Sequence, residues 1–184
     1  MIVFLDFEAS SLGKHGFPIE VGWAAEDGTE ASHLIRPAPG WEEWSEEAES
    51  IHGITRDQLA REGTPHDSVA RALVEALTGH DLYASAPSWD GHWLSLLLRA
   101  GGFNRKTLTL RDSDELHDEA AMAAFRRAGL DLQTLADRIH ETVAAAKRAI
   151  EDAAPPAHRA LADARQELRL WREVARRAEA AARG

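Results

Sequence analysis

The sequence predicts an α/β domain with a mixed five-stranded sheet flanked by helices. Three observations predict it: a continuous apolar run of strand length at the start, two further strand-like runs joined by a turn, and strand patterns that later alternate with helical ones. A chain of 184 residues, of which 44% are hydrophobic, is large enough for one substantial core. We therefore expect residues 1–184 to form a single domain.

Three strands are expected in the first part of the chain. Residues 2–7 are continuously apolar and rich in β-branched and aromatic side chains, which is typical of a central strand buried on both faces. Residues 19–25 and 31–35 follow, and Asp27-Gly28 between them favours a hairpin turn. This side of the sheet should be antiparallel. Two later strands are expected at residues 82–86 and 106–110.

Helical patterns occupy most of the remaining chain. Glycine and proline residues mark where three of these helices are expected to end or be interrupted: Gly101-Gly102, Gly129 and Pro155-Pro156. The expected helices are residues 42–49, 68–77, 89–100, 112–128, 132–150 and about 159–182.

Composition excludes several classes of protein. The absence of cysteine excludes disulfide frameworks and thiolate zinc sites. A formal net charge of −10 argues against a protein that wraps nucleic acid, although an enzyme that holds only a few nucleotides at a chain end needs little basic surface. The apolar run ended by Asp6 is too short for a membrane span and lacks the features of a signal peptide. We expect a soluble, cytoplasmic protein with no membrane partner.

Acidic residues stand at the ends of predicted elements. Asp6 and Glu8 are two residues apart on a strand, so both carboxylates point to the same face. Carboxylates suit hard cations such as Mg²⁺ and Mn²⁺. The pair is equally consistent with a strand that merely reaches the surface. Taken alone, Asp90 is a typical residue of a helix N-terminus, and His158 and Asp163 are typical of a solvated loop and an exposed helix.

Together these segments resemble one family. Asp6-Phe7-Glu8 resembles a D-x-E motif, Ser88-Trp89-Asp90 a motif that ends in aromatic-Asp, and residues 158–163 the H-x-A-L-x-D-A motif of DnaQ-like (DEDDh) 3′→5′ exonucleases. Residues 51–55 and 19–22 resemble two further segments of these enzymes. The order and spacing match over essentially the whole chain. The resemblance implies an RNase H-like fold.

The resemblance also implies a mechanism. Asp6, Glu8, Asp90 and Asp163 would hold two Mg²⁺ or Mn²⁺ ions for the hydrolysis of a terminal phosphodiester bond. His158 would be the general base, because a histidine with an ordinary pKa near 6.5 is neutral at mildly alkaline pH and accepts a proton. The segment that carries it would be hinged by Pro155-Pro156.

The residues after Glu8 would seat the terminal nucleotide: Ala9, Ser10 and Leu12. Two departures from the family pattern are present, of which the first leaves the substrate class open and the second would reshape the nucleotide pocket slightly. Residues 84–87 read Ala-Ser-Ala-Pro where relatives often have His-Asn or Gly-Asn, and Ser11 stands where glycine is common. The expected partner is a nucleic acid with a free 3′ end, single-stranded by preference, and DNA is not separated from RNA. The resemblance also allows a homodimer.

Two alternatives remain at this stage. The domain could be a non-catalytic or proofreading-type subunit that binds nucleic acid, or another metal-dependent phosphohydrolase on the same fold. The complete set of four carboxylates and His158 favours an active exonuclease. Glu20 and His52 are assigned to structure. The arginines Arg165, Arg169, Arg172 and Arg176 recur at helical spacing, which favours cover for apolar surface and pairing with acids over a phosphate track.

Overall fold

The sheet has six strands in the order β4-β3-β2-β1-β5-β6. The computed structural model describes the chain except for residues 130–131, 154–156 and 184. The strands are β1 (Ile2–Ala9), β2 (Pro18–Ala25), β3 (Glu30–Arg36), β4 (Thr64–Pro65), β5 (Asp81–Ala84) and β6 (Leu110–Asp112). β1, β2 and β3 are antiparallel, whereas β5 is parallel to β1 and β6 to β5. The predicted mixed α/β fold is confirmed, but the expected number of five strands was wrong.

The observed strands differ from the expected ones in two places. β4 contains only two residues, which pair with Ile35 and Arg36, and no hydrophobic pattern marks so short a strand. The strand expected at residues 106–110 begins only at Leu110. Asn104 explains the shift, because its side chain accepts a hydrogen bond from the Lys106 amide and its carbonyl accepts one from the Thr107 amide. The chain turns there instead of extending.

Seven helices accompany the sheet in the described part of the chain. They are α1 (Glu46–His52), α2 (Arg56–Glu62), α3 (His66–Leu77), α4 (Pro87–Ala100), α5 (Ser113–Arg127), α6 (Leu132–Ala153) and α7 (Ala160–Arg183). The helix expected at residues 42–49 begins at Glu46, because the Ser45 side chain caps it by accepting from the Ala48 amide. α2 was not expected. Thr55 caps it in the same way, by accepting from the Gln58 amide.

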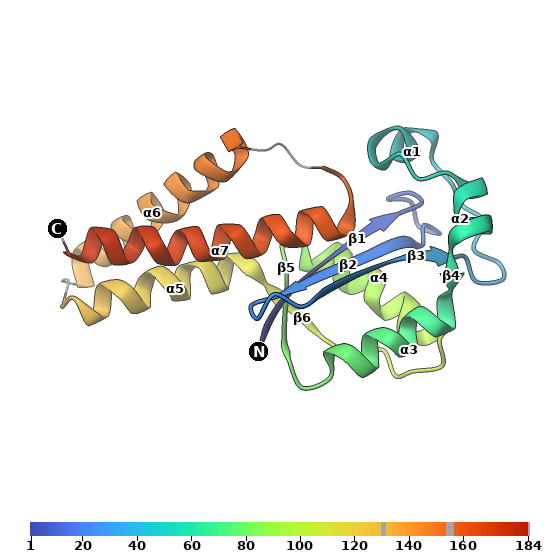
Figure 1. The fold of residues 1–184 in the computed structure, drawn as a ribbon, viewed down its shortest axis with the longest axis horizontal. Coiled ribbons are helices and arrows are strands. Elements are labelled where there is room, and N and C mark those ends of the chain that lie inside the picture. The colour runs from blue at the N-terminus through green and yellow to red at the C-terminus, as the bar shows by residue number, and fades with distance from the viewer. Residues whose placement is uncertain (130–131, 154–156, 184) are drawn as a thin grey trace.

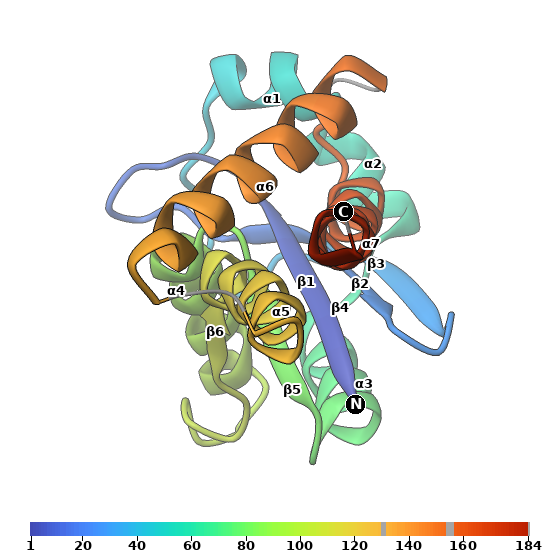
Figure 2. The same ribbon diagram turned by 90° about the vertical axis from the view of Figure 1, so that its left-hand side faces the viewer.

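Helices cover both faces of the sheet (Figure 1). α3 and α4 lie on one face, where Val3, Leu5 and Phe7 of β1 enter the core, and α7 crosses the other face, where Phe4 packs with Leu168. The alternation along β1 therefore separates two apolar layers. α5, α6 and α7 extend past the sheet as three packed helices with an apolar core of their own (Figures 1 and 2). Among the described residues, no helix has the length and apolar character needed to cross a membrane.

Gly22 sets the position of α7 on the sheet. A Cβ atom built on Gly22 would lie 2.2 Å from the Leu161 nitrogen and 2.5 Å from the Ala160 carbonyl carbon. Only glycine lets the first turn of α7 approach β2 so closely. As a result, the first turn of α7 lies beside the end of β1, where Asp6 and Glu8 are.

Candidate metal centre

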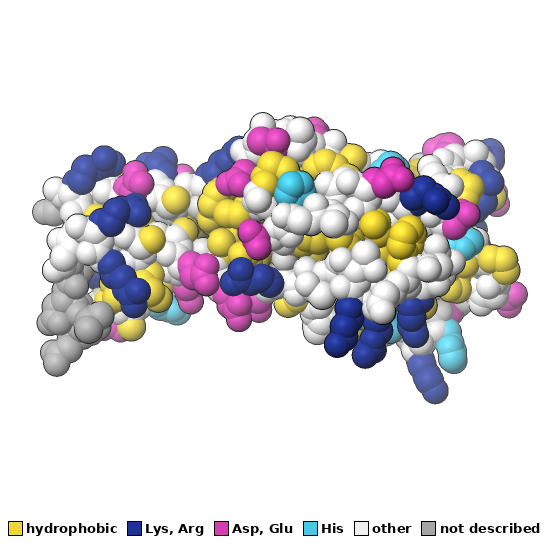
Figure 3. All heavy atoms as spheres, turned by 90° about the horizontal axis from the view of Figure 1, so that it is seen from below, with side chains coloured by type: hydrophobic (Ala, Val, Ile, Leu, Met, Phe, Trp, Pro, Cys, Tyr) yellow, Lys and Arg dark blue, Asp and Glu magenta, His cyan; other side chains and the backbone are white. Residues whose placement is uncertain are grey.

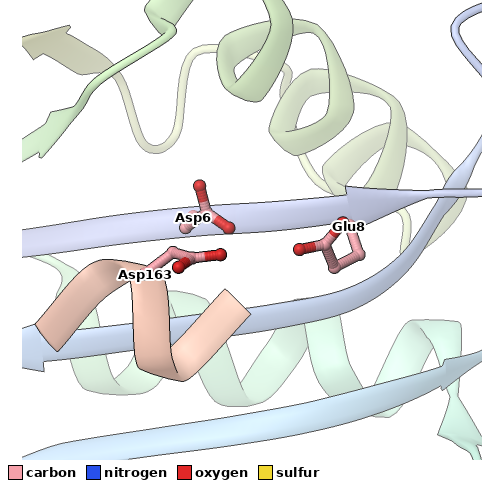
Figure 4. Close-up of side chains that lie close together, drawn as sticks. All are labelled: Asp6, Glu8 and Asp163. Atoms are coloured by element: carbon pink, nitrogen blue, oxygen red, sulfur yellow. The ribbon is translucent and has the colours of Figure 1, made fainter. Parts of the chain in front are cut away.

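Three carboxylates converge between β1 and α7. Asp6 and Glu8 lie on β1, Asp163 lies on the first turn of α7, and one carboxylate oxygen of each is within 4.8 Å of the others. Figure 4 shows the three side chains gathered over the strand. Asp6 and Glu8 share a face because a strand repeats every two residues. The structure thus joins the first and last of the sequence motifs.

Asp90 lies behind this cluster in the first turn of α4 and is only 4% exposed. The pairing of β1 with β5 ends at Phe4, and beyond that point the backbones of Phe7 and Ala86 lie near the Asp90 carboxylate. Burial raises the pKa of Asp90 to about 7, although these two backbone groups oppose the rise. Asp90 therefore lies close to the segment of β1 that carries Asp6 and Glu8.

Two carboxylates of the cluster, those of Asp6 and Glu8, have raised pKa values and so resist ionisation. Burial raises the pKa of Asp6 well above its usual range, and the charges of Asp90, Glu8 and Asp163 raise it further. Burial, followed by the charge of Asp163, raises the pKa of Glu8 to about 7. Such a group of oxygens is unfavourable when bare and fits a hard divalent cation such as Mg²⁺ or Mn²⁺, which would offset the repulsion.

Glu167 is a further acid near the centre that the sequence analysis did not identify. It lies one turn after Asp163 on α7, and its carboxylate accepts a hydrogen bond of 2.8 Å from the Ser113 hydroxyl. Burial raises its pKa, and its charge contributes to the raised pKa values of Asp6 and Asp90. Its spacing of four residues from Asp163 was the available signal, because residues i and i+4 share a helix face.

Asp163 also holds the segment that leads into α7. Its two carboxylate oxygens accept hydrogen bonds from the backbone amides of Ala157 and Arg159, each 3.1 Å long. His158, between them, is exposed and has a φ of 50°, a left-handed conformation that is rare outside glycine. No described contact joins its ring to the three carboxylates. The predicted hinge at Pro155-Pro156 lies outside the described residues.

Glu20 anchors the same segment from β2. It is 2% exposed and accepts hydrogen bonds from Arg159 Nε at 3.0 Å, from an Arg159 terminal nitrogen at 2.7 Å and from the Ala160 amide at 3.0 Å. Glu20 is also the cross-strand neighbour of Glu8. Its structural assignment is confirmed. Together, Glu20 and Gly22 fit the start of α7 to one face of β2.

His52 has the structural role that was expected. The ring is buried, and its Nδ1 accepts a hydrogen bond of 3.0 Å from the Ile54 amide across the turn at Gly53. Gly53 has a φ of 70°, which suits glycine. Burial lowers the pKa of His52, so the ring is neutral when it accepts this bond.

A cavity of about 770 Å³ opens beside the carboxylates. Ala9 and Leu12 line it, as expected for residues that seat a nucleotide, and Leu12 is 69% exposed. Ser10, the third residue expected to seat the nucleotide, does not line the cavity. It is fully buried, because its hydroxyl accepts a hydrogen bond from the Phe17 amide, and the neighbouring Ser11 lines the cavity instead. Further lining residues are Trp44, Ile51, Trp89 and Trp93.

The arginines of α7 are mostly engaged with the sheet and with their own helix. Arg165 forms an ion pair with Glu30, and Arg176 forms one with Glu173. Arg172 donates to the backbone carbonyl of Glu26 in the β2–β3 turn. These contacts favour the structural interpretation of the row over a track for phosphates.

The comparisons with known proteins agree on the fold. No family model matches the chain, and no curated protein is detectably similar in sequence. Exonuclease I from Methylocaldum szegediense, which is moderately thermophilic, superimposes with a TM-score of 0.64 and 18% identity over 94% of this chain and 40% of its own. The zinc-bound complex of E. coli exonuclease I with single-stranded DNA gives a TM-score of 0.63 and 15% identity over 91% of this chain and 38% of its own.

A complex of E. coli exonuclease I with a dT13 oligonucleotide is similar to the same degree, with a TM-score of 0.61, 15% identity, and coverage of 91% of this chain and 39% of that one. At such identity the likeness shows the fold alone. The predicted RNase H-like fold is confirmed. The chain spans about two fifths of the length of these three exonuclease I structures.

Proposed function

We propose that this chain is a divalent-metal-dependent 3′→5′ exonuclease of the DnaQ-like class, with residues 1–184 as its exonuclease domain. It would remove nucleotides one at a time from the 3′ end of a single strand. One observation carries the proposal: the carboxylates of Asp6, Glu8 and Asp163 converge on a fold shared with exonuclease I.

Each carboxylate has a proposed role. Asp6, Glu8 and Asp163 would hold a first Mg²⁺ or Mn²⁺ ion, Asp6 would bridge towards a second ion, and Asp90 would act directly or through water. Two such ions supply an activated water and stabilise the leaving oxygen of a phosphodiester. The raised pKa values of Asp6, Glu8 and Asp90 support this assignment, because burial, and to a smaller extent neighbouring carboxylates, makes their ionised forms unfavourable without a cation.

His158 is proposed as the general base. The ring would accept the proton of the attacking water once the segment before α7 brings it over the cluster. Asp163 connects metal binding with the general base. It belongs to the carboxylate cluster, and it also accepts hydrogen bonds from the backbone amides on both sides of His158. The cavity beside Glu8 suits the terminal base, because Leu12 and Trp89 present exposed apolar and aromatic surface for stacking.

Single-stranded DNA is the first substrate to test. Structures of exonuclease I that share this fold contain dT13 and dA16 oligonucleotides. The net charge of −10 also favours a grip on a few nucleotides over binding along a duplex. The homodimer that the resemblance allows gains no support from the comparisons, and the proposal does not depend on it.

The decisive experiment uses strands labelled at the 5′ end. Single-stranded DNA, single-stranded RNA, duplex DNA and dinucleotides are incubated with the protein and Mg²⁺, Mn²⁺ or EDTA. We expect a ladder that shortens from the 3′ end with either metal and no cleavage in EDTA. The Asp6→Asn variant is the negative control. Binding of strands without any cleavage would favour the non-catalytic alternative instead.

A further inference from the structure

A second cavity shares the side chain of Trp44 with the cavity of the metal centre. It measures about 370 Å³ and is lined by Phe17, Arg36, Pro37, Trp41, Trp44, Arg56 and Ala60. Trp44 also lines the cavity beside Asp6 and Glu8. The two cavities therefore share a wall, and the proposed terminal-nucleotide site does not include the second one.

A row of aromatic rings connects the two cavities. From the cavity of the metal centre outwards, the rings are His52, Trp44, Phe17, Trp41 and His66. Successive ring centroids are 6.4, 6.3, 5.5 and 5.9 Å apart. Phe17 is buried and stacks on Trp41, so Trp41 is held in place while it remains part of the cavity wall. Ordered aromatic side chains of this kind are platforms on which unpaired bases stack.

Two exposed arginines stand at this cavity, Arg36 and Arg56. Neither has a carboxylate within 4.0 Å among the described residues, whereas Arg165 and Arg176 each form an ion pair. Arg56 lies over the Trp44 ring, 5.1 Å from its centroid, and donates to the Glu42 carbonyl. In a chain with 31 acidic and 21 basic residues, these two arginines beside an aromatic wall offer positive charge that an anion could contact.

We propose that this cavity binds the nucleotides of a single strand that lie upstream of the 3′ end held at the metal centre. A base would stack on Trp41, and phosphates would lie at Arg36 and Arg56. The inference rests on the proposed function, because it places the 3′ end beside Asp6 and Glu8. Aromatic stacking with arginine contacts to the backbone is the chemistry that recognises single strands irrespective of sequence.

The test measures binding apart from hydrolysis. Fluorescence anisotropy in EDTA gives the Kd of oligothymidylates labelled at the 5′ end, from the dinucleotide upwards, for the whole chain. We expect affinity to rise with length until the strand reaches the second cavity. Arg36→Gln should weaken binding of the longer strands on the order of tenfold. The slope of log Kobs against log salt should become shallower by about 0.7, because one phosphate of the single strand would no longer be neutralised.

Arg61→Gln is the matched control. Arg61 is exposed on α2 and does not line the cavity. Arg61→Gln removes one positive charge, as Arg36→Gln does, but the Kd of this variant for each strand should equal that of the unsubstituted chain. Trp41→Leu tests the stacking platform and should weaken binding of the longer strands about 5- to 100-fold. Because Trp41 packs against the core, the fold of this variant is checked by circular dichroism, and Arg36→Gln provides the independent test if that variant unfolds.

The outcomes separate this inference from the proposed function. Hydrolysis in Mg²⁺ together with equal affinities for Arg36→Gln and Arg61→Gln would overturn the second site and leave the exonuclease assignment intact. Length-dependent binding that Arg36→Gln reduces, in a chain that hydrolyses nothing, would support the strand site and remove the exonuclease assignment.

Discussion

Two halves of the candidate centre are held by different forces. The β1 half consists of Asp6 and Glu8, which lie on a strand paired on both sides, with Asp90 close to the same strand. The α7 half consists of Asp163 and His158, whose position depends on carboxylates that accept backbone amides. The first half is held by strand pairing and apolar packing, whereas the second half depends on polar contacts that metal binding can alter.

Asp163 is the point at which the halves meet. Its two oxygens accept the amides of Ala157 and Arg159, and one of them also lies within 4.8 Å of ligand oxygens of Asp6 and Glu8. An ion at the cluster would compete with these amides for the same oxygens. The difference between the halves therefore predicts that equivalent substitutions will have unlike effects on stability.

The largest effect is expected from removing one ligand charge in each half. Asp6→Asn and Asp163→Asn should each lower exonuclease activity on the order of 10⁴-fold, the scale for loss of an essential catalytic group. Without metal, Asp6→Asn should gain about 1 kcal/mol, or about 2–4 °C in Tm, because it removes a buried charge that its neighbours repel. Asp163→Asn should lose a similar amount, because one amide oxygen replaces two acceptors.

Strand degradation and calorimetric melting in EDTA measure the two quantities. Asp6→Asn that melts below the unsubstituted chain would show that the β1 half is not under electrostatic strain. Equal melting shifts for both variants would remove the distinction between the halves.

The next largest effect is expected at His158, where two substitutions separate the role of the imidazole ring from the cost of the backbone conformation. His158→Ala should lower turnover about 10²- to 10⁴-fold, as removal of a positioned base does. His158→Gly should lose as much activity as His158→Ala but have a higher Tm than that variant. Glycine adopts a φ of 50° without the cost of about 1 kcal/mol that other residues carry. Turnover of a short single strand and Tm are measured together.

His140→Ala is the matched control, since His140 is exposed on α6. Titration calorimetry with Mg²⁺ gives a second readout, which should be unchanged in His158→Ala because the ring is not a proposed ligand. Full turnover by the alanine variant would exclude the general-base role, and a loss of metal affinity would make His158 a ligand.

The same division explains what the sequence could predict. The β1 half follows from local rules: an apolar run defines the strand, and a spacing of two puts Asp6 and Glu8 on one face. The cluster with Asp163 was implied only by resemblance to a family, because its members are 157 or 155 residues apart in the chain. No local pattern encodes that distance.

The contacts that hold the α7 half could not be predicted. The bonds from Arg159 to Glu20 join residues 139 apart, and the fit of Gly22 to Leu161 depends on the path of the last helix in the chain. β4 and α2 were missed because each is short and lacks a clear period. The burial of Ser10 was not predictable for a related reason: its hydroxyl accepts a hydrogen bond from the Phe17 amide, a contact that no local pattern marks.

A smaller effect on stability is expected from the anchor of the α7 half. Glu20→Gln breaks an ion pair whose carboxylate is 3% exposed, and it should lower the free energy of unfolding by about 1–3 kcal/mol. Turnover should fall more than substrate affinity, because the start of α7 carries His158. Glu30→Gln is the matched control: it breaks a similar pair between a strand and α7, but on the surface, and no measurable change is expected.

Urea unfolding and steady-state kinetics on both variants test this point. Equal effects of Glu20→Gln and Glu30→Gln would mean that the buried pair has no special role in positioning α7. An unfolding effect for Glu20→Gln without a change in turnover would restrict Glu20 to stability.

The smallest effect expected is the dependence of stability on pH in the metal-free chain, and it isolates the β1 half. Burial raises the pKa of Glu8 and of Asp90 to about 7, against ordinary values near 4. A carboxyl with a higher pKa in the folded chain binds protons more tightly there, so its contribution to stability is complete below about pH 4 and lost as pH rises through about 7. In EDTA, Tm should therefore fall by a few degrees between about pH 5 and 8. Mg²⁺ should offset the fall, because ions compete with protons for the same oxygens. Asp6→Asn should flatten the EDTA curve by removing one titrating group, and a Tm that rises over this range in EDTA would contradict the raised pKa values that support the metal assignment.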